Sequence, residues 1–316
     1  MTCAGDLTTP ALLADAGVLE ANMATMSAAR PGLALRPHVK AFKCTALAAR
    51  LAAADHVGFC CATVREMEGM AVADLGEDLL LANEIVDPQV AGRLGALVVA
   101  GTRVTVAVDS SETIDVAAAA GIREVLVDVD VGMPRCGCDP ADAGRLADEA
   151  RNAGLTVRGV MGYEGHLQHL VDRVERERRT ALSMAVLTTA HAEVGGDVVS
   201  GGGTGTWDCN HVVTELQAGS FVLMDGDYAQ LGLPFAEGLV VLTTAVSVRP
   251  GQHVALDGGL KALAMDSGGP QLVDDQGGAA EVLFCSDEHT TVAGGSWAIG
   301  DRVGLRPAHI DPTIAK

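Results

Sequence analysis

Lysine is the scarcest basic residue of this chain: among 316 residues it has 22 Lys and Arg, but Lys only at positions 40, 43, 261 and 316. Chemistry that needs a lysine amine is therefore confined to four places. Aromatic residues make up only 3% of the chain, so Ala, Val, Leu and Gly must build the core. The net charge of −19 argues against a nucleic acid or an anionic membrane surface as a partner.

Targeting and membrane signals are also missing. No segment reaches the roughly 18–20 uninterrupted apolar residues of a membrane span, and the start, Met-Thr-Cys-Ala-Gly-Asp, has no signal-peptide pattern. We therefore expect a cytoplasmic protein with eight reduced cysteines. Cys60–Cys61 and Cys136–Cys138 lack the spacing of a structural zinc site, so we interpret the cysteines as small buried hydrophobes.

Short apolar runs that alternate with stretches of helical period indicate the fold of the first three-quarters. Most runs are continuous, as expected of strands buried on both faces of a parallel sheet. The predicted strands are 33–35, 57–61, 79–82, 104–108, 125–131, 157–161, 198–200 and 221–224. The predicted helices are 14–29, 45–54, 64–73, 88–99, 112–120, 140–153 and 170–194. Eight β units predict a (β/α)₈ TIM barrel, although 208–215 is short for a helix; an open doubly wound sheet is the alternative.

The pattern changes after about position 234. Alternating segments at 240–248, 253–257, 281–285 and 302–305 are separated by Gly-rich turns, which predicts a small antiparallel β domain. We therefore expect an α/β barrel domain over 14–235, and a second domain formed by 236–316 with 1–13.

Polar residues follow the predicted barrel strands, and the carboxyl ends of parallel barrel strands share one face, which carries active sites. Lys40 follows the first strand, beside Arg36, His38 and Lys43. Neighbouring cations lower the pKa of a lysine and favour the neutral amine that a Schiff base needs. The alternative is a lysine at the barrel rim with no chemical role.

Two further motifs each allow two interpretations when they are considered alone. The Gly-rich segment 200–206 fits either a phosphate cradle or a tight turn, and Gly219–Ser220 would be its partner at the next strand. His309 and Asp311, at i and i+2 of a predicted β segment, fit either two ligands of a divalent cation or a hydrogen-bonded pair.

Nine motifs follow one another in order along nearly the whole chain. They are Thr9-Pro-Ala, Arg36-Pro-His-Val-Lys40, Gly58-Phe-Cys-Cys-Ala-Thr63, Asp128-Val-Asp-Val-Gly-Met, Gly162-Tyr-Glu-Gly-His166, Ser200-Gly-Gly-Gly-Thr-Gly-Thr206, Glu215-Leu-Gln-Ala-Gly-Ser220, Ser286-Asp-Glu-His289 and His309-Ile-Asp-Pro-Thr313. With these motifs the chain resembles the fold-type III pyridoxal-phosphate enzymes and, within them, the group of D-threonine aldolase, 3-hydroxy-D-aspartate aldolase and D-serine dehydratase.

The resemblance implies an alanine racemase-like barrel with a β domain, and a homodimer whose sites lie between the barrel of one subunit and the β domain of the other. It implies that Lys40 holds pyridoxal 5′-phosphate, that Tyr163 faces its ring nitrogen and that Arg135 approaches the ring oxygen or the substrate. The phosphate would be bound by Ser200, Gly202, Gly203, Thr204, Gly219 and Ser220. His309 and Asp311 would bind a divalent metal.

The implied reaction is cleavage of a D-β-hydroxy-α-amino acid to glycine and an aldehyde. We expect either His166 or a metal-bound hydroxide to be the base for the β-hydroxyl. Asp311, where dehydratases usually have Cys, favours Mn²⁺ or Mg²⁺ over Zn²⁺ and therefore an aldolase. A D-serine or 3-hydroxyaspartate dehydratase is the alternative within the fold, and a non-catalytic pyridoxal-phosphate carrier the alternative outside enzymes. One departure is Phe42, where the family usually has a second His; its effect on substrate scope stays open.

Overall fold

Parallel strands form one of the two compact units of the computed structural model, which describes residues 4–316. This unit spans Met26–Gly219; the other joins the residues up to Thr25 to Ser220–Lys316. Within the described residues, seven strands follow chain order across the sheet: β2 (Gly58–Cys61), β3 (Asp78–Leu81), β4 (Val104–Val108), β5 (Glu124–Asp128), β6 (Thr156–Gly162), β7 (Val198–Gly201) and β8 (Glu215–Leu216).

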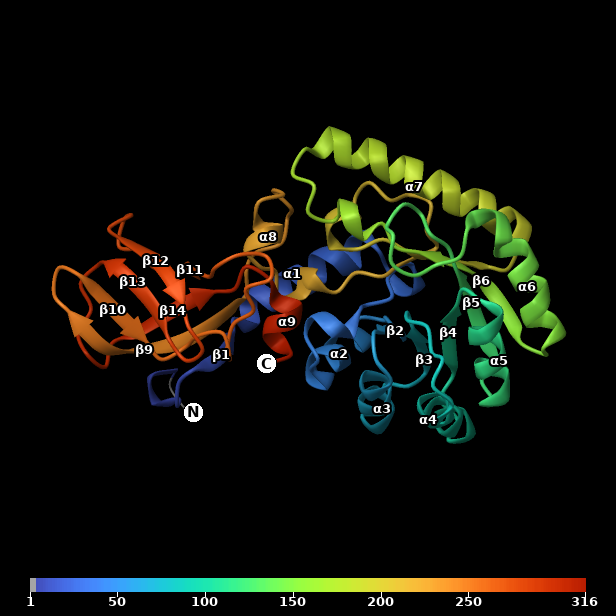
Figure 1. The fold of residues 1–316 in the computed structure, drawn as a ribbon, viewed down its shortest axis with the longest axis horizontal. Coiled ribbons are helices and arrows are strands. Elements are labelled where there is room, and N and C mark those ends of the chain that lie inside the picture. Colours follow the sequence, from blue (N-terminus) through green and yellow to red (C-terminus); the bar gives the residue numbers. More distant parts are fainter. Residues whose placement is uncertain (1–3) are drawn as a thin grey trace. The chain divides into compact units, whose positions relative to one another are not determined.

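Helices alternate with these strands and lie outside them (Figure 1). They are α2 (Thr45–Ala52), α3 (Val64–Val72), α4 (Pro88–Val99), α5 (Ser111–Ala119), α6 (Ala143–Asn152) and α7 (Arg173–Val194). Short 3₁₀ turns are η2 (Gly32–Ala34), η3 (Val39–Ala41), η4 (Pro140–Asp142), η5 (Gly165–Leu167) and η6 (Thr204–Thr206). The helix predicted at 88–99 from its helical period is confirmed to the residue, and the Asp87 side chain caps its start while Pro88 opens it.

The sheet is closed by the segment before Lys40, although this segment is no regular strand. Leu35 pairs with Leu216 of β8, and His38 pairs with Cys60 of β2. The Arg36 N–H donates to Leu216 O over 2.9 Å, whereas Pro37 has no N–H to donate. The predicted strand at 33–35 is therefore wrong in part, because its first residues form η2. The predicted (β/α)₈ barrel is confirmed, and the doubly wound alternative is wrong.

The barrel interior is apolar in its middle and charged near the strand starts. One layer takes a residue from each of five neighbouring strands and is built without aromatic rings: Cys60, Leu80, Ala107, Leu126 and Met161.

Asp78, the first residue of β3, binds the guanidinium groups of Arg36 and Arg158 near the strand starts, and Arg36 also binds Glu215 over 2.7 Å. These charges are paired, as buried charges must be.

The last barrel strand lies earlier in the chain than the predicted one. The apolar run 221–224 begins in the 3₁₀ turn η7 (Ser220–Val222), and 208–215 forms no helix; β8 is the dipeptide Glu215–Leu216. A short apolar run cannot by itself distinguish a buried strand from a buried turn. The sequence does not indicate β8 as a strand because β8 contains a charged residue, Glu215. This charge can be buried because it forms an ion pair with Arg36.

The second unit is built on an antiparallel sheet with the order β11-β14-β9-β10-β13-β12, and β1 pairs with β9. The strands are β1 (Ala11–Ala14), β9 (Leu239–Arg249), β10 (His253–Leu256), β11 (Gln271–Leu272), β12 (Ala280–Cys285), β13 (Thr290–Gly294) and β14 (Arg302–Arg306). The helices are η1 (Ala4–Asp6), α8 (Gly226–Ala229) and α9 (Ile310–Ile314); α1 (Ala16–Ala29) begins in this unit. The predicted β domain is confirmed, while β1, β11 and β13 were not predicted.

Its core is aliphatic, in keeping with the composition: Val241, Val254, Leu256, Leu263, Val292 and Leu305 are among its buried residues, and Trp297 packs against them.

The seven cysteines among the described residues are free thiols; four are buried, two are half-buried and Cys44 is exposed, so the interpretation as buried hydrophobes holds only in part. Cys3 and the first three residues of the chain lie outside the described part. Within the described part, every helix is too short or too polar to cross a membrane.

Candidate active site

Lys40 follows the segment that closes the barrel. It lies in η3, half-buried, and its backbone N–H donates to Nδ1 of His38 over 3.4 Å. The next barrel connection packs against this turn: a Cβ on Gly219 would lie 2.2 Å from the His38 carbonyl oxygen and 3.1 Å from the Ala41 side chain. Glycine is therefore required at position 219, and the structure brings this predicted site residue beside the Lys40 turn.

The buried His38 lies close to Lys40, and its pKa reflects the charges around both residues. Its pKa lies well below the ordinary value, first because of burial and then because Lys40, Lys43 and Arg135 place positive charge near it. His38 is therefore neutral at physiological pH. Three cationic side chains thus lie near this neutral imidazole, although Lys43 is paired with Glu66.

Arg135 and Tyr163 also meet at the carboxyl end of the strands. The Arg135 guanidinium carbon lies 5.4 Å from the centre of the Tyr163 ring, within cation–π range. The loop that carries Arg135 is folded back on the end of β5 by pairing between Val129 and Cys138, and by the Gly137 N–H, which donates to Asp109. The pair lines a small hollow with the loop after β5.

The carboxyl that ends β5 has an unusual acidity. Burial, and next the nearby Glu84 carboxylate, raise the pKa of Asp128 well above its ordinary value. The Asp128 carboxyl therefore stays protonated at a pH where an exposed aspartate is charged, and it can donate a hydrogen bond in this hollow.

His166, the predicted base, lies in η5 after β6 and is exposed. Burial of part of the ring, and then Arg179, lower its pKa, which leaves a neutral imidazole able to accept a proton. Its Cε1 lies 3.5 Å from the Cβ position of Gly132, so the loop after β5 passes close to it.

The Gly-rich segment after β7 is more tightly bonded than its sequence indicates. The buried Ser200 hydroxyl donates to Glu215 over 2.7 Å and accepts from Gln217 over 2.8 Å. The Gly202 N–H donates to Glu164 over 3.2 Å, and the Gly203 N–H to the Thr206 hydroxyl over 3.3 Å. Thr204 is buried. Ser220 follows Gly219 and opens η7.

Sequence reasoning missed three buried polar residues that support this segment: Glu164, Gln168 and Asn210. Two of them follow β6 within the motif that carries Tyr163 and His166. The sequence Tyr-Glu-Gly-His-Leu-Gln carries no signal that separates the buried Glu164 and Gln168 from the exposed His166, so their burial is visible only in the fold.

The predicted metal ligands lie in the other unit, and their local structure differs from the prediction. His309 immediately precedes α9, and Asp311 is in its first turn, so the β segment is wrong. Pro312 favours this helix start, since proline fits a first turn, where its missing N–H would have no partner. His309 Nδ1 bonds Asp266 Oδ2 over 2.6 Å. The described residues contain no group of three or more His, Cys, Asp or Glu that could hold a metal.

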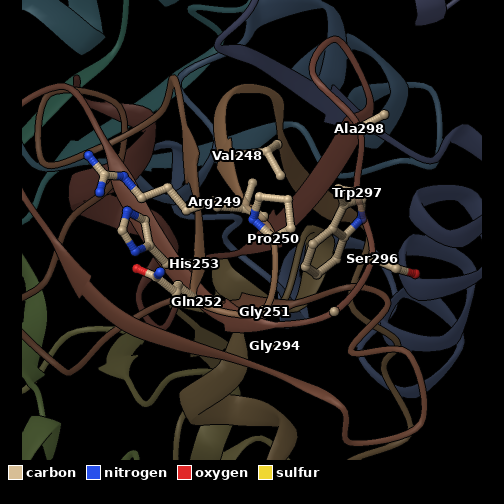
Figure 2. Close-up of a pocket in the computed structure, with 12 residues that line it drawn as sticks. Val248, Arg249, Pro250, Gly251, Gln252, His253, Gly294, Ser296, Trp297 and Ala298 are labelled. Atoms are coloured by element: carbon tan, nitrogen blue, oxygen red, sulfur yellow. The ribbon is translucent and has the colours of Figure 1, made fainter.

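Another pocket of the second unit, of about 460 Å³, contains none of the predicted site residues. It lies between the β9–β10 turn and the loop before β14. Figure 2 shows Arg249 and His253 on one side and the Trp297 ring on the other.

Two known protein families match this chain, one over the barrel and one over the antiparallel sheet. The family described as "Alanine racemase, N-terminal domain" matches residues 14–225, and the one described as "Putative serine dehydratase domain" matches residues 238–316. The first match covers more than half of the chain, so the chain belongs to the alanine racemase-like family.

Several individual relatives within this family are named as aldolases. The chain is 36% identical over 332 residues to a D-threonine aldolase of Arthrobacter sp., covering 97% of this chain and 86% of that protein. It is 32% identical to the 3-hydroxy-D-aspartate aldolase of Paracoccus denitrificans (strain Pd 1222), covering 98% and 86%. The solved D-threonine aldolase from Filomicrobium marinum superposes with a TM-score of 0.92, at 32% identity, covering 98% and 90%. The chain is thus an enzyme of the lyase class, and the predicted family is confirmed.

Proposed function

We propose that this protein is a pyridoxal-phosphate-dependent aldolase that cleaves D-β-hydroxy-α-amino acids, of the D-threonine or 3-hydroxy-D-aspartate type, to glycine and an aldehyde. The observation that carries the proposal is Lys40 at the carboxyl end of the barrel strands, beside a neutral His38 and the Arg135–Tyr163 pair. The similarity to two named aldolases over nearly the whole chain supports this choice of reaction.

The residues around Lys40 fit the cofactor. Lys40 would hold it through its amine, Tyr163 and Arg135 would contact the ring, and Ser200, Gly202, Gly203, Thr204, Gly219 and Ser220 would surround the phosphate. When bound, pyridoxal phosphate supplies an electron sink for the negative charge left on Cα when the Cα–Cβ bond breaks. The cations that lower the pKa of His38 also suit the carboxylate of an amino-acid substrate.

His166 would take the proton of the substrate β-hydroxyl. A base for this step must be neutral near pH 7, and the lowered pKa of His166 meets that condition. Removal of this proton allows the carbonyl group of the aldehyde product to form as the carbon–carbon bond breaks.

His309 and Asp311 would hold a divalent metal, with Mn²⁺ or Mg²⁺ preferred over Zn²⁺ because of the carboxylate. The Asp266 contact supports this role, because a carboxylate on Nδ1 of a histidine fixes the tautomer that offers Nε2 to a metal. A bound metal would lower the pKa of a coordinated hydroxyl. We further propose a homodimer, as the resemblance implies, and a cytoplasmic location, as the sequence predicts.

A product assay tests the reaction. Purified protein is loaded with pyridoxal phosphate and Mn²⁺, then incubated separately with D-threonine, 3-hydroxy-D-aspartate and D-serine. We expect glycine with acetaldehyde from the first, or glycine with glyoxylate from the second. Ammonia with a keto acid would instead establish the second candidate, a dehydratase, which the match of residues 238–316 favours. No turnover of any of the three would overturn both.

A further inference from the structure

Glu164 is a fully buried carboxylate directly after Tyr163. Three neutral donors converge on it from the segment after β7. Oε1 accepts from the Thr206 hydroxyl over 2.8 Å and from Asn210 Nδ2 over 3.0 Å, and Oε2 accepts from the Gly202 N–H over 3.2 Å. The side chain thus connects the end of β6 to both ends of η6.

A carboxylate is the side chain that this arrangement requires. It accepts at both oxygens and donates at neither, whereas an amide would turn an NH₂ group toward one of the three donors. Burial raises the pKa of Glu164, against the effect of these hydrogen bonds. A buried charge of this kind is unfavourable unless its hydrogen bonds are complete, so the three donors and the carboxylate stabilise one another.

Gln168 reinforces the same connection from the other end of η5. Its Oε1 accepts from the Gly205 N–H over 2.8 Å, and its Nε2 donates to the Thr206 hydroxyl over 3.1 Å. The backbone is packed too closely here for any other residue, because a Cβ on Gly205 would lie 1.9 Å from the Gln168 carbonyl oxygen. The Thr206 hydroxyl is therefore held on three sides, by Glu164, Gln168 and the Gly203 N–H.

We infer that Glu164 is a positioning residue: through Gly202, Thr206 and Asn210 it fixes the Gly-rich segment in the conformation that receives the phosphate group of the cofactor. The inference rests on the proposed function. It means that the Gly202 N–H and the Thr206 hydroxyl donate to Glu164 and not to the phosphate group. It also connects the phosphate side of the site to Tyr163, the adjacent residue, on the ring side.

The test measures equilibrium binding instead of turnover. Dissociation constants for pyridoxal 5′-phosphate and for pyridoxal, which lacks the phosphate, are measured by fluorescence for the wild type, Glu164→Gln, Thr206→Val and the double variant. We expect each single variant to weaken pyridoxal phosphate about 10- to 100-fold, the range of one hydrogen bond to a charged group. Pyridoxal binding should change much less. The double variant should lose little more than either single variant, because both act through one contact.

The control is Asp78→Asn, which removes another buried carboxylate, at the start of β3. It should leave the ratio of the two dissociation constants unchanged even if it destabilises the fold. An equal loss for both ligands in Glu164→Gln, or none, would overturn the inference. If Glu164→Gln does not fold, Thr206→Val decides by the same ratio. A wild type that binds neither ligand would instead overturn the proposed function, and the inference with it.

Discussion

Lys40 and Lys43 are close in sequence but have different surroundings. Lys43 forms an ion pair with Glu66, a residue of α3, while Lys40 lies in η3 beside His38. Of these two lysines, only Lys40 stands at the position of the Arg36-Pro-His-Val-Lys40 motif, so the sequence already favours it as the residue that holds the cofactor.

This difference gives the first prediction. Wild-type protein with pyridoxal phosphate should show an absorbance band near roughly 410–430 nm, and Lys40→Ala should lose it, because no amine remains to hold the cofactor. Lys43→Ala is the matched control and should keep the band. A Lys40→Ala protein with the wild-type spectrum would remove Lys40 from the site.

Asp78 carries a second prediction, on stability. Burial opposes its charge, but Arg36 and Arg158 outweigh burial and hold its pKa at about 2, against an ordinary 3.8. Because the pKa of Asp78 is lower in the folded state, its ionised carboxylate contributes to the free energy of unfolding above pH 3.8. This contribution is lost as the pH falls toward 2. The loss amounts to about 2 kcal/mol. Urea unfolding from pH 5 to 2 should show this slope in the wild type. The slope should be reduced in Asp78→Asn; an unchanged slope would show that other carboxyls produce it.

Helices with a clear period were predictable from the sequence, and elements that depend on distant partners were not. Every predicted helix before position 195 forms, with its ends shifted by at most three residues. By contrast, β8 contains Glu215, whose burial makes sense only once Arg36 lies opposite it. The same holds for the site. Lys40 and Tyr163 belong to recognisable motifs, while Glu164 and Gln168 gain their meaning from a segment some 40 residues away.

Two glycines in different surroundings give a prediction on packing. Gly69 lies within α3 with open space around its Cβ position, whereas Gly205 lies in η6 against Gln168. Gly69→Ala should raise the free energy of unfolding by about 0.5–1 kcal/mol, since alanine is the better helix former. Gly205→Ala should lower it by about 1–3 kcal/mol through overpacking. Urea unfolding measures both; equal effects would contradict the packing described for η6.

At the scale of the whole molecule, the residues proposed for the reaction are divided between two folded units. Lys40, Tyr163 and His166 belong to Met26–Gly219, and His309 and Asp311 to the unit that includes Ser220–Lys316. If the sites of the proposed homodimer are shared between subunits, two differently damaged chains can form one intact site. A symmetric dimer has two equivalent sites, so a mixed dimer would contain one intact site and one doubly damaged site.

Complementation therefore tests the assembly. Lys40→Ala and His309→Ala should each be nearly inactive alone. After subunit exchange at equal amounts, half of the dimers are mixed, and activity should return to about a quarter of the wild type. Lys40→Ala mixed with His166→Ala is the control and should recover nothing, because both changes lie in the same unit. Sites made within single chains would give no recovery in either mixture. A fully active His309→Ala would instead remove the metal ligand from the proposal, because a residue that completes the reaction centre cannot be dispensable.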